Sequence, residues 1–325
     1  MNTFNMLPLL AAVLLQSMAA APVLAQAFPS KPIRLILTYP PGGGSDTIAR
    51  PVARKMSENI GQQVIVDNRG GAGGNLGMEA AARAAPDGYT VVMGLTAQLA
   101  VNPALFPKIP YDPIRDFEPI MLFANGGYLL VSHPSLPAKT VNEVIAIARK
   151  QPGQLLYASS GNGSGGHLAS ELFNVMAGVR ITHVPYKGGA QAMVDTVAGQ
   201  TQLLFTPPIS SAGHVASGRL RAIAVSTTKR ISSMPNLPTI AESGVPGYDS
   251  GVWYAMLAPR GTPQNVLARL HEEFRKVLAD PGIRDFLTKS GIDPEGGSPE
   301  ELARYMRSEL AKWAKVVKDA NIKLD

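Results

Sequence analysis

Short apolar runs alternate with amphipathic segments along most of this chain. Residues 33–39 and 64–66 are apolar runs that predict buried strands, and a helical pattern lies between them. The apolar face of that helix is Ile48, Val52, Met56 and Ile60. We expect Ser45 or Asp46 to cap its start, Pro51 to kink it or tighten its first turn, and Gly61 to end it. A strand, a helix and a second strand in this order predict a βαβ unit of a parallel sheet.

The same alternation continues to residue 258. Further strands are predicted at residues 89–93, 128–131, 155–158, 180–184, 203–206, 221–226 and 252–258. Further helices are predicted at residues 76–85, 140–150, 167–177 and 190–198, with two more in the tail that begin near Thr262 and Ser298. Thr140 with Glu143 forms the pattern of a capping box. A proline-rich connection at residues 102–119 separates two such series.

The two series predict two α/β lobes. Because the strand at 252–258 is expected to return to the first series, we assign residues 28–125 and 249–325 to lobe 1 and residues 126–248 to lobe 2. Two hinge segments, near residues 119–131 and 221–258, would then connect the lobes and leave a cleft between them.

The first 27 residues have the features of an export signal. Met6–Ala21 is almost continuously apolar, and Ala25-Gln26-Ala27 is a typical cleavage site that would leave Phe28 as the first mature residue. Cleavage after Ala25 fits as well. The first five residues carry no Lys or Arg, so an uncleaved membrane anchor is the alternative. Since no later stretch approaches the ~18 apolar residues of a membrane span, we expect a soluble, exported protein.

Composition narrows the chemistry. The chain has no cysteine, which excludes disulfides, thiolate metal sites and cysteine nucleophiles. Its net charge of +6 favours anionic partners. Aromatic residues make up only 6%, and Lys and Arg do not cluster in runs, so we expect no nucleic-acid partner. The histidines have no ligand-like spacing, and we expect neither a metal nor a cofactor.

Three glycine-rich loops carry the main functional signal. Residues 41–46, 159–166 and 186–189 each follow a predicted strand and open a helix. The first N–H groups of a helix lack internal partners and carry partial positive charge, so such loops bind carboxylate or phosphate. The alternative is that these glycines only form tight turns. Asp46 could act as a base or as a cap, and His167 could donate to an anion or cap its helix.

The second loop also matches a dinucleotide fingerprint. Gly161, Gly163 and Gly166 give G-x-G-x-x-G, but no acidic residue follows about twenty positions later. Lys187 in that window could tolerate a 2′-phosphate. An NADP-dependent enzyme, or a hydrolase that uses Ser164, is therefore the alternative function, although Ser164 lacks the G-x-S-x-G context.

Several motifs together resemble the Bug family of periplasmic receptors of the tripartite tricarboxylate transporter type. The motifs are Ser30-Lys-Pro-Ile-Arg, Pro41-Gly-Gly-Gly-Ser-Asp46, Val66-Asp-Asn-Arg-Gly-Gly-Ala-Gly-Gly-Asn75, Pro86-Asp-Gly-Tyr89, Gly161-Asn-Gly-Ser-Gly-Gly-His-Leu168, Pro185-Tyr-Lys-Gly188 and Leu237-Pro-Thr-Ile-Ala-Glu242. The resemblance implies a non-catalytic, periplasmic, two-lobed Venus-flytrap receptor of the type II-like fold, each lobe a mixed, mostly parallel sheet flanked by helices. It implies capture of a di- or tricarboxylate, an acidic amino acid or an aromatic acid, delivery to a membrane transporter or a sensor kinase, and a monomer.

The resemblance also assigns the binding residues. They are Gly42, Gly43, Gly44, Ser45 and Asp46 in the first loop; Ser160, Gly161, Gly163, Ser164 and His167 in the second; and Tyr186, Lys187, Gly188 and Gly189 in the third, to which we add Thr96, Phe205 and Thr206. Many family members carry an acidic residue near the end of the strand at 203–206, and this chain has none. Phe205 and Pro207 there favour an aromatic or otherwise apolar carboxylate.

Overall fold

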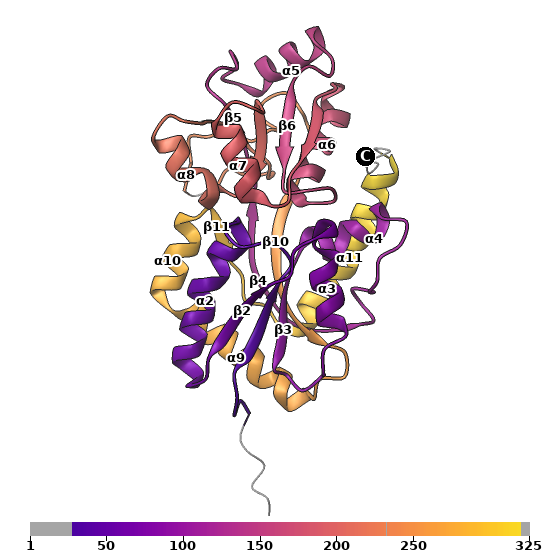
Figure 1. Cartoon of the computed structure of the whole chain (residues 1–325), viewed down its shortest axis with the longest axis vertical. Helices are drawn as coiled ribbons and strands as arrows, with labels where there is room; N and C mark the ends of the chain where they lie inside the picture. Colours follow the sequence, from indigo (N-terminus) through magenta and orange to yellow (C-terminus); the bar gives the residue numbers. More distant parts are fainter. Residues whose placement is uncertain (1–27, 232, 320–325) are drawn as a thin grey trace, which may run out of the picture.

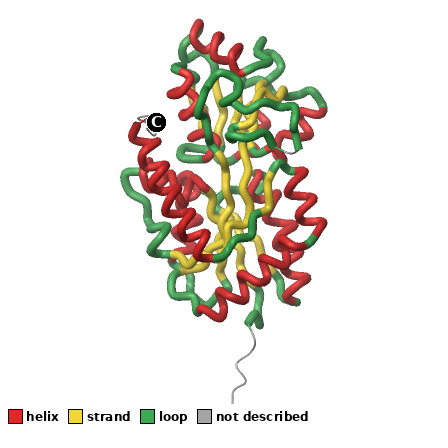
Figure 2. Tube along the Cα trace, turned by 180° about the vertical axis from the view of Figure 1, so that it is seen from behind, coloured by secondary structure: helices red, strands yellow, loops and turns green. Residues whose placement is uncertain are grey.

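The computed structural model describes residues 28–231 and 233–319, which form two β-sheets flanked by helices (Figure 1). The predicted export signal, residues 1–27, lies outside the described residues. The strands run through the middle of both halves of the molecule, with helices on their outer sides (Figure 2). The α/β architecture with two mixed sheets is the one that the sequence predicts.

The larger sheet has six strands in the order β11-β4-β10-β3-β1-β2. The strands are β1 (Ile33–Leu37), β2 (Val64–Asn68), β3 (Thr90–Leu95), β4 (Phe117–Gly127), β10 (Gly251–Pro259) and β11 (Ile292–Pro294). The helical segments are α2 (Gly44–Ile60), η2 (Ala72–Gly74), α3 (Asn75–Ala82), η3 (Ala97–Val101), α4 (Asn102–Leu105), α9 (Gln264–Ala279), α10 (Pro281–Lys289) and α11 (Pro299–Asp319). Figure 1 shows α2 and α10 on one side of this sheet and α3, α4 and α11 on the other. We call this unit the large-sheet lobe.

The smaller sheet has five strands in the order β7-β6-β8-β5-β9. Its strands are β5 (Leu129–Ser132), β6 (Leu156–Ser159), β7 (Thr182–Pro185), β8 (Leu203–Thr206) and β9 (Arg221–Val225). Its helices are α5 (Val141–Lys150), α6 (Gly165–Ala177), α7 (Gly189–Val197) and α8 (Pro208–Ala216). We call this unit the small-sheet lobe; it forms the upper part of the molecule in Figure 1.

The chain passes between the lobes at two adjacent places. β4 leads directly into β5, and β10 returns from β9 to pair antiparallel with β4 along its whole length. Ser226 joins these passages: its hydroxyl accepts a hydrogen bond from the Tyr128 N–H at 2.8 Å and donates one to the Ser250 carbonyl at 2.6 Å. The fully buried Ser226 thus holds together the two segments that would flex if the lobes moved.

Local sequence signals located most elements to within a few residues. Gly61 ends α2 with a left-handed conformation, and Thr140 with Glu143 forms the expected capping box of α5. The buried face of α2 includes Ile48, Val52 and Met56, as its pattern indicates.

Three expectations about the elements are wrong. Ser45 and Asp46 do not cap α2, because Gly43 is its N-cap and both lie in the first turn. Parallel pairings are not the majority: β1 pairs in parallel with β2 and β3, and β6 with β7 and β8, while every other pairing is antiparallel. The proline-rich connection also ends earlier, because β4 already begins at Phe117. Pro119 lies in β4 beside a register shift against β10, which is where a strand tolerates proline.

Candidate functional site

A cavity of about 400 Å³ lies between the two lobes. The large-sheet lobe contributes the start of α2, the ends of β3 and β10, and Tyr39; the small-sheet lobe contributes β8 and the starts of α6, α7 and α8. The sequence-predicted residues that line it are Gly42, Gly43, Gly44, Ser45, Ser160, Gly189, Phe205 and Thr206. Residues from all three predicted loops therefore meet at one cavity.

Four α-helices of the described part of the chain begin at this cavity. First-turn residues that line it are Gly44 and Ser45 of α2, Gly165 and Gly166 of α6, Gly189 and Ala190 of α7, and Ile209 and Ser210 of α8. The first N–H groups of each helix have no intrahelical acceptor, and each N-terminus carries about half a positive charge. Four such ends around one space form a site for an anionic group that needs no cationic side chain.

Asp46 positions the first loop from behind the cavity wall. Its carboxylate accepts a hydrogen bond from the Gly42 N–H at 3.1 Å and two from Arg50, at 2.8 and 2.9 Å. Burial alone would raise the pKa of Asp46, but the hydrogen bonds from Arg50, Gly42 and Asn68 lower it below its usual value. Asp46 does not line the cavity, so its place in the predicted ligand set is not supported by the geometry.

The second loop presents only some of the residues predicted: Ser160 lines this cavity, whereas Ser164 and His167 do not. The Ser164 hydroxyl caps α6 by accepting from the His167 N–H at 3.4 Å, and His167 Nδ1 accepts from the Gly163 N–H at 3.1 Å. The His167 ring also stacks on His183, with ring centroids 4.2 Å apart. Ser164 and His167 are buried and line neither this cavity nor the next one described. Gly165 and Gly166 line the cavity in their place, and the buried Ser164 hydroxyl is not placed as a nucleophile.

The third loop divides between two cavities. Gly189 lines the first cavity, whereas Tyr186 and Lys187, together with Gly161, line a second cavity of about 560 Å³. The two cavities share Tyr39 and Ser160.

Three other predicted residues have structural positions instead. Gly163 and Gly188 line neither cavity. Thr96 bonds the hinge strand: its hydroxyl accepts from the Trp253 N–H at 2.8 Å and donates to the Gly251 carbonyl at 3.4 Å.

The lobes are in contact across the cavity, so this conformation is closed. A Cβ atom on Gly44 would lie 2.8 Å from Pro207 Cγ, and one on Gly42 would lie 3.5 Å from Ala190 Cβ. Gly42 and Gly44 belong to the large-sheet lobe, whereas Pro207 and Ala190 belong to the small-sheet lobe. These glycines let the two backbones approach closely enough to enclose the space.

Three tyrosines are among the polar cavity residues that sequence reasoning missed, together with Thr47, Ser210 and His214. Tyr39, Tyr128 and Tyr254 line the cavity, and burial raises the pKa of each hydroxyl, that of Tyr39 to about 12. All three are therefore neutral hydrogen-bond donors near pH 7. Among the described residues that line this cavity there is no Asp, Glu, Lys or Arg. Tyr128 and Tyr254 lie beside or within hinge strands, and no local motif marked them.

Two further features of the described residues bear on function. No group of three or more His, Asp or Glu side chains among them could hold a metal ion. None of the helices within residues 28–231 and 233–319 has the length and apolar character that a membrane span requires.

Comparison with known proteins gives one consistent picture. A family model described as the tripartite tricarboxylate transporter family receptor matches residues 48–322. The UPF0065 protein in the tcbD-tcbE intergenic region of Pseudomonas sp. (strain P51) is 40% identical over 90% of this chain and 87% of its own length. Protein BugT of Bordetella pertussis is 34% identical over the full length of both proteins.

Solved structures agree with these relatives. Rpa4515 of R. palustris, solved with adipate, has a TM-score of 0.88 and 38% identity, covering 91% of this chain and 99% of that one. MatC of Rhodopseudomonas palustris, with bound malate, has a TM-score of 0.85 and 31% identity, covering 89% of this chain and all of that one.

Proposed function

Because the chain belongs to the tripartite tricarboxylate transporter receptor family, as its motifs predict, we propose that it captures a small organic carboxylate in the cavity between its lobes. The observation that carries this proposal is that helix N-termini from both lobes open on one enclosed space. A carboxylate there accepts hydrogen bonds from both lobes only when they are closed, so the ligand stabilises the closed state.

The cavity wall supports an acid with one or two carboxylates and an apolar body. Leu95, Phe205, Pro207 and Val252 form apolar parts of the wall, and no Lys or Arg side chain of the described residues lines it to balance a third charge. The adipate in Rpa4515 and the malate in MatC are both acids with two carboxylates. An aromatic monocarboxylate such as benzoate also fits this chemistry, whereas citrate fits it least.

The receptor would act as an exported monomer in the periplasm. It would deliver its ligand unchanged to a membrane transporter or a sensor kinase, and it would catalyse no reaction. The buried, hydrogen-bonded hydroxyl of Ser164 supports this interpretation over a serine-dependent enzyme.

Isothermal titration calorimetry with adipate, malate, benzoate and citrate tests the proposal. We expect at least one of the first three acids to bind more tightly than citrate. Mass spectrometry of the acid after prolonged incubation should recover it unaltered. A clear preference for citrate would contradict the ligand class, chemical conversion of the acid would show an enzyme, and failure of every carboxylate to bind would refute the receptor function.

A further inference from the structure

Tyr254 lines the cavity, and its buried hydroxyl has no hydrogen-bond partner among the described residues. The residue is 0% exposed. It lies in β10, where its backbone is opposite Leu95 of β3 on one side and Ala124 of β4 on the other. A central strand therefore holds the side chain in place, and the hydroxyl cannot reach solvent by a small movement of an exposed loop.

Two other buried tyrosines among the described residues have hydrogen-bond partners for their hydroxyls. The Tyr248 hydroxyl donates to the Ala169 carbonyl at 2.7 Å, and the Tyr111 hydroxyl donates to the Gln98 carbonyl at 2.8 Å. Neither of these two tyrosines lines the cavity. Buried polar groups are nearly always hydrogen-bonded, so an exception that faces a ligand-sized space indicates a partner that enters with the ligand.

The hydroxyl makes no hydrogen bond to the backbone N–H groups at the starts of α2, α6, α7 and α8, or to any other group of the described residues. A phenol hydroxyl donates to a carboxylate, hydroxyl or carbonyl oxygen. Burial raises its pKa, so it keeps its proton at neutral pH.

We propose that Tyr254 is a specificity-determining residue that donates a hydrogen bond to a second polar oxygen of the ligand, one that the helix N-termini do not hold. This inference rests on the proposed receptor function and narrows it: the receptor selects acids with a polar group distant from the first carboxylate and discriminates against monocarboxylates that lack one, benzoate included. An apolar group placed against the hydroxyl would leave it buried and unpaired, which is a strong basis for rejection.

Three six-carbon probes test this selection. Hexanoate, 6-hydroxyhexanoate and adipate share a carboxylate and a chain length but differ at the far end. For the wild-type chain we expect calorimetry to show adipate or 6-hydroxyhexanoate binding about 10-fold more tightly than hexanoate, which is ~1.4 kcal/mol. Tyr254→Phe should reduce that preference to less than about 3-fold, because it removes the bond to the far oxygen of adipate or 6-hydroxyhexanoate and also relieves the penalty of an unpaired hydroxyl against hexanoate.

Tyr248→Phe is the matched control, since it removes a hydroxyl that is equally buried but lies away from the cavity. It should keep the wild-type preference among the three acids. Equal weakening of all three acids by Tyr254→Phe would overturn the proposal, because the hydroxyl would then act on the shared carboxylate or on packing. No change for any acid would overturn it as well.

Thermal unfolding without ligand provides a readout that does not depend on the acid. Tyr254→Phe should unfold within about 2 °C of the wild type or above it, because no protein bond is lost. Tyr248→Phe should unfold at a lower temperature, because the Ala169 carbonyl loses its partner. Similar destabilisation by both variants would show that the Tyr254 hydroxyl has a structural partner and would overturn the proposal. If no acid bound to the wild type, the receptor function would fail, and this comparison would still decide whether the hydroxyl is committed to the fold.

Discussion

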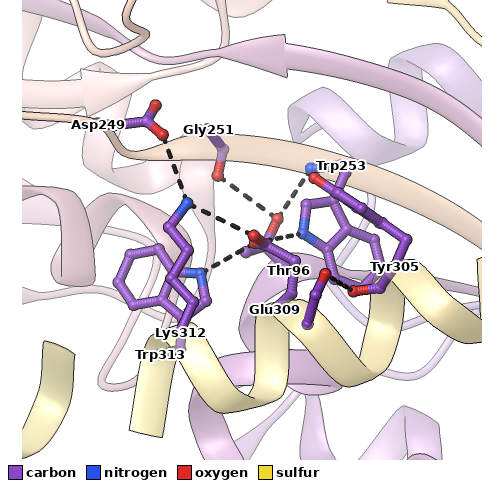
Figure 3. A network of polar contacts seen from close by, with 9 residues as sticks. Thr96, Asp249, Gly251, Trp253, Tyr305, Glu309, Lys312 and Trp313 are labelled. Atoms are coloured by element: carbon purple, nitrogen blue, oxygen red, sulfur yellow. Dashed lines mark hydrogen bonds and ion pairs between the residues drawn. The ribbon is translucent and has the colours of Figure 1, made fainter. Parts of the chain in front are cut away.

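The carboxylate of Glu309 accepts a hydrogen bond from the indole N–H of Trp253, with Oε2 and Nε1 3.1 Å apart (Figure 3). The same oxygen accepts from the Trp313 indole at 3.2 Å, and Lys312 lies 3.4 Å from the other oxygen. Glu309 belongs to α11, whereas Trp253 belongs to β10 and directly precedes Tyr254. Because successive side chains of a strand point to opposite faces, α11 holds one face of β10 while Tyr254 forms cavity wall on the other.

Replacing Glu309 should therefore destabilise the fold. Glu309→Leu leaves two buried indole N–H groups without an acceptor, and we expect the free energy of unfolding to fall by about 1–3 kcal/mol. Glu309→Gln retains one acceptor oxygen, so its free energy of unfolding should fall by less. Urea unfolding of the two variants measures the difference, and wild-type stability of Glu309→Leu would show that the contact contributes nothing.

Gly44→Ala should weaken ligand binding without unfolding the protein. Its Cβ would lie 2.8 Å from Pro207 Cγ and 3.2 Å from Ser210 Oγ of the opposite lobe, so it obstructs closure. The backbone of Gly44 is helical, where alanine is favourable. We expect the dissociation constant of the best acid to rise about 10-fold, which is ~1.4 kcal/mol, with an unchanged or higher unfolding temperature.

Gly213→Ala is the matched control for that variant. Gly213 is a helical glycine of α8 with open space around its Cβ position, and it does not line the cavity. Gly213→Ala should bind the best acid with the same dissociation constant as the wild type. Equal affinity of Gly44→Ala and Gly213→Ala would contradict the close approach of the lobes at Gly44.

The fold could be predicted from the sequence wherever its signals are local. Each of the three glycine loops consists of residues that are close together along the chain, and so does the Thr140–Glu143 capping box. Their patterns can therefore be recognised directly in the sequence. α8 was missed because it begins at Pro207-Pro208, which reads as a break, although proline is well suited to a first helical turn. That omission also concealed the fourth helix N-terminus at the cavity.

The side chains of the candidate site depend on tertiary structure and were harder to predict. Tyr254 lies in a correctly predicted strand, but only the sheet order shows that it faces the cavity. Ser164 and His167 belong to the right loop, yet the short turn directs them to each other and to Gly163. The motif therefore located the loop but did not indicate which of its residues face the cavity.

Asp46→Asn should lower stability in a pH-dependent way. The Asp46 carboxylate has a pKa below its usual value of 3.8 in the folded protein, so its stabilising effect is fully present above that value and is lost as the pH falls through the lowered pKa. We expect Asp46→Asn to cost about 1–2 kcal/mol at pH 7, since its hydrogen bonds involve charged groups. The difference in free energy of unfolding between this variant and the wild type should become smaller as the pH falls below 3.8.

Urea unfolding of both proteins across this pH range measures the effect. Asp67→Asn is an informative comparison, because the Asp67 side chain is 25% exposed against 7% for Asp46, so the loss of its ion pairs should cost less. If the difference in free energy of unfolding between Asp46→Asn and the wild type stayed constant with pH, the charge of Asp46 would not contribute and the side chain would act through its shape alone.

Ligand affinity should stay constant as the pH rises from 7.5 to 9.5. Over this range the acid is fully ionised, and the tyrosines of the cavity wall are the groups whose ionisation would change its hydrogen-bond donors. Burial raises the pKa of Tyr39 to about 12 and raises those of Tyr128 and Tyr254, so all three hydroxyls keep their protons over this range. Ionisation of one of them would replace a donor with a negative charge beside the carboxylate, and affinity would fall as the pH approached its pKa.

Calorimetric titrations at half-unit pH steps measure this dependence. The stability of the protein is checked at each step, because raised tyrosine pKa values make the fold lose stability above pH 10. A fall in affinity with a midpoint below pH 9.5 would show that a hydroxyl in contact with the ligand is more acidic, and therefore more hydrated, than this closed cavity allows.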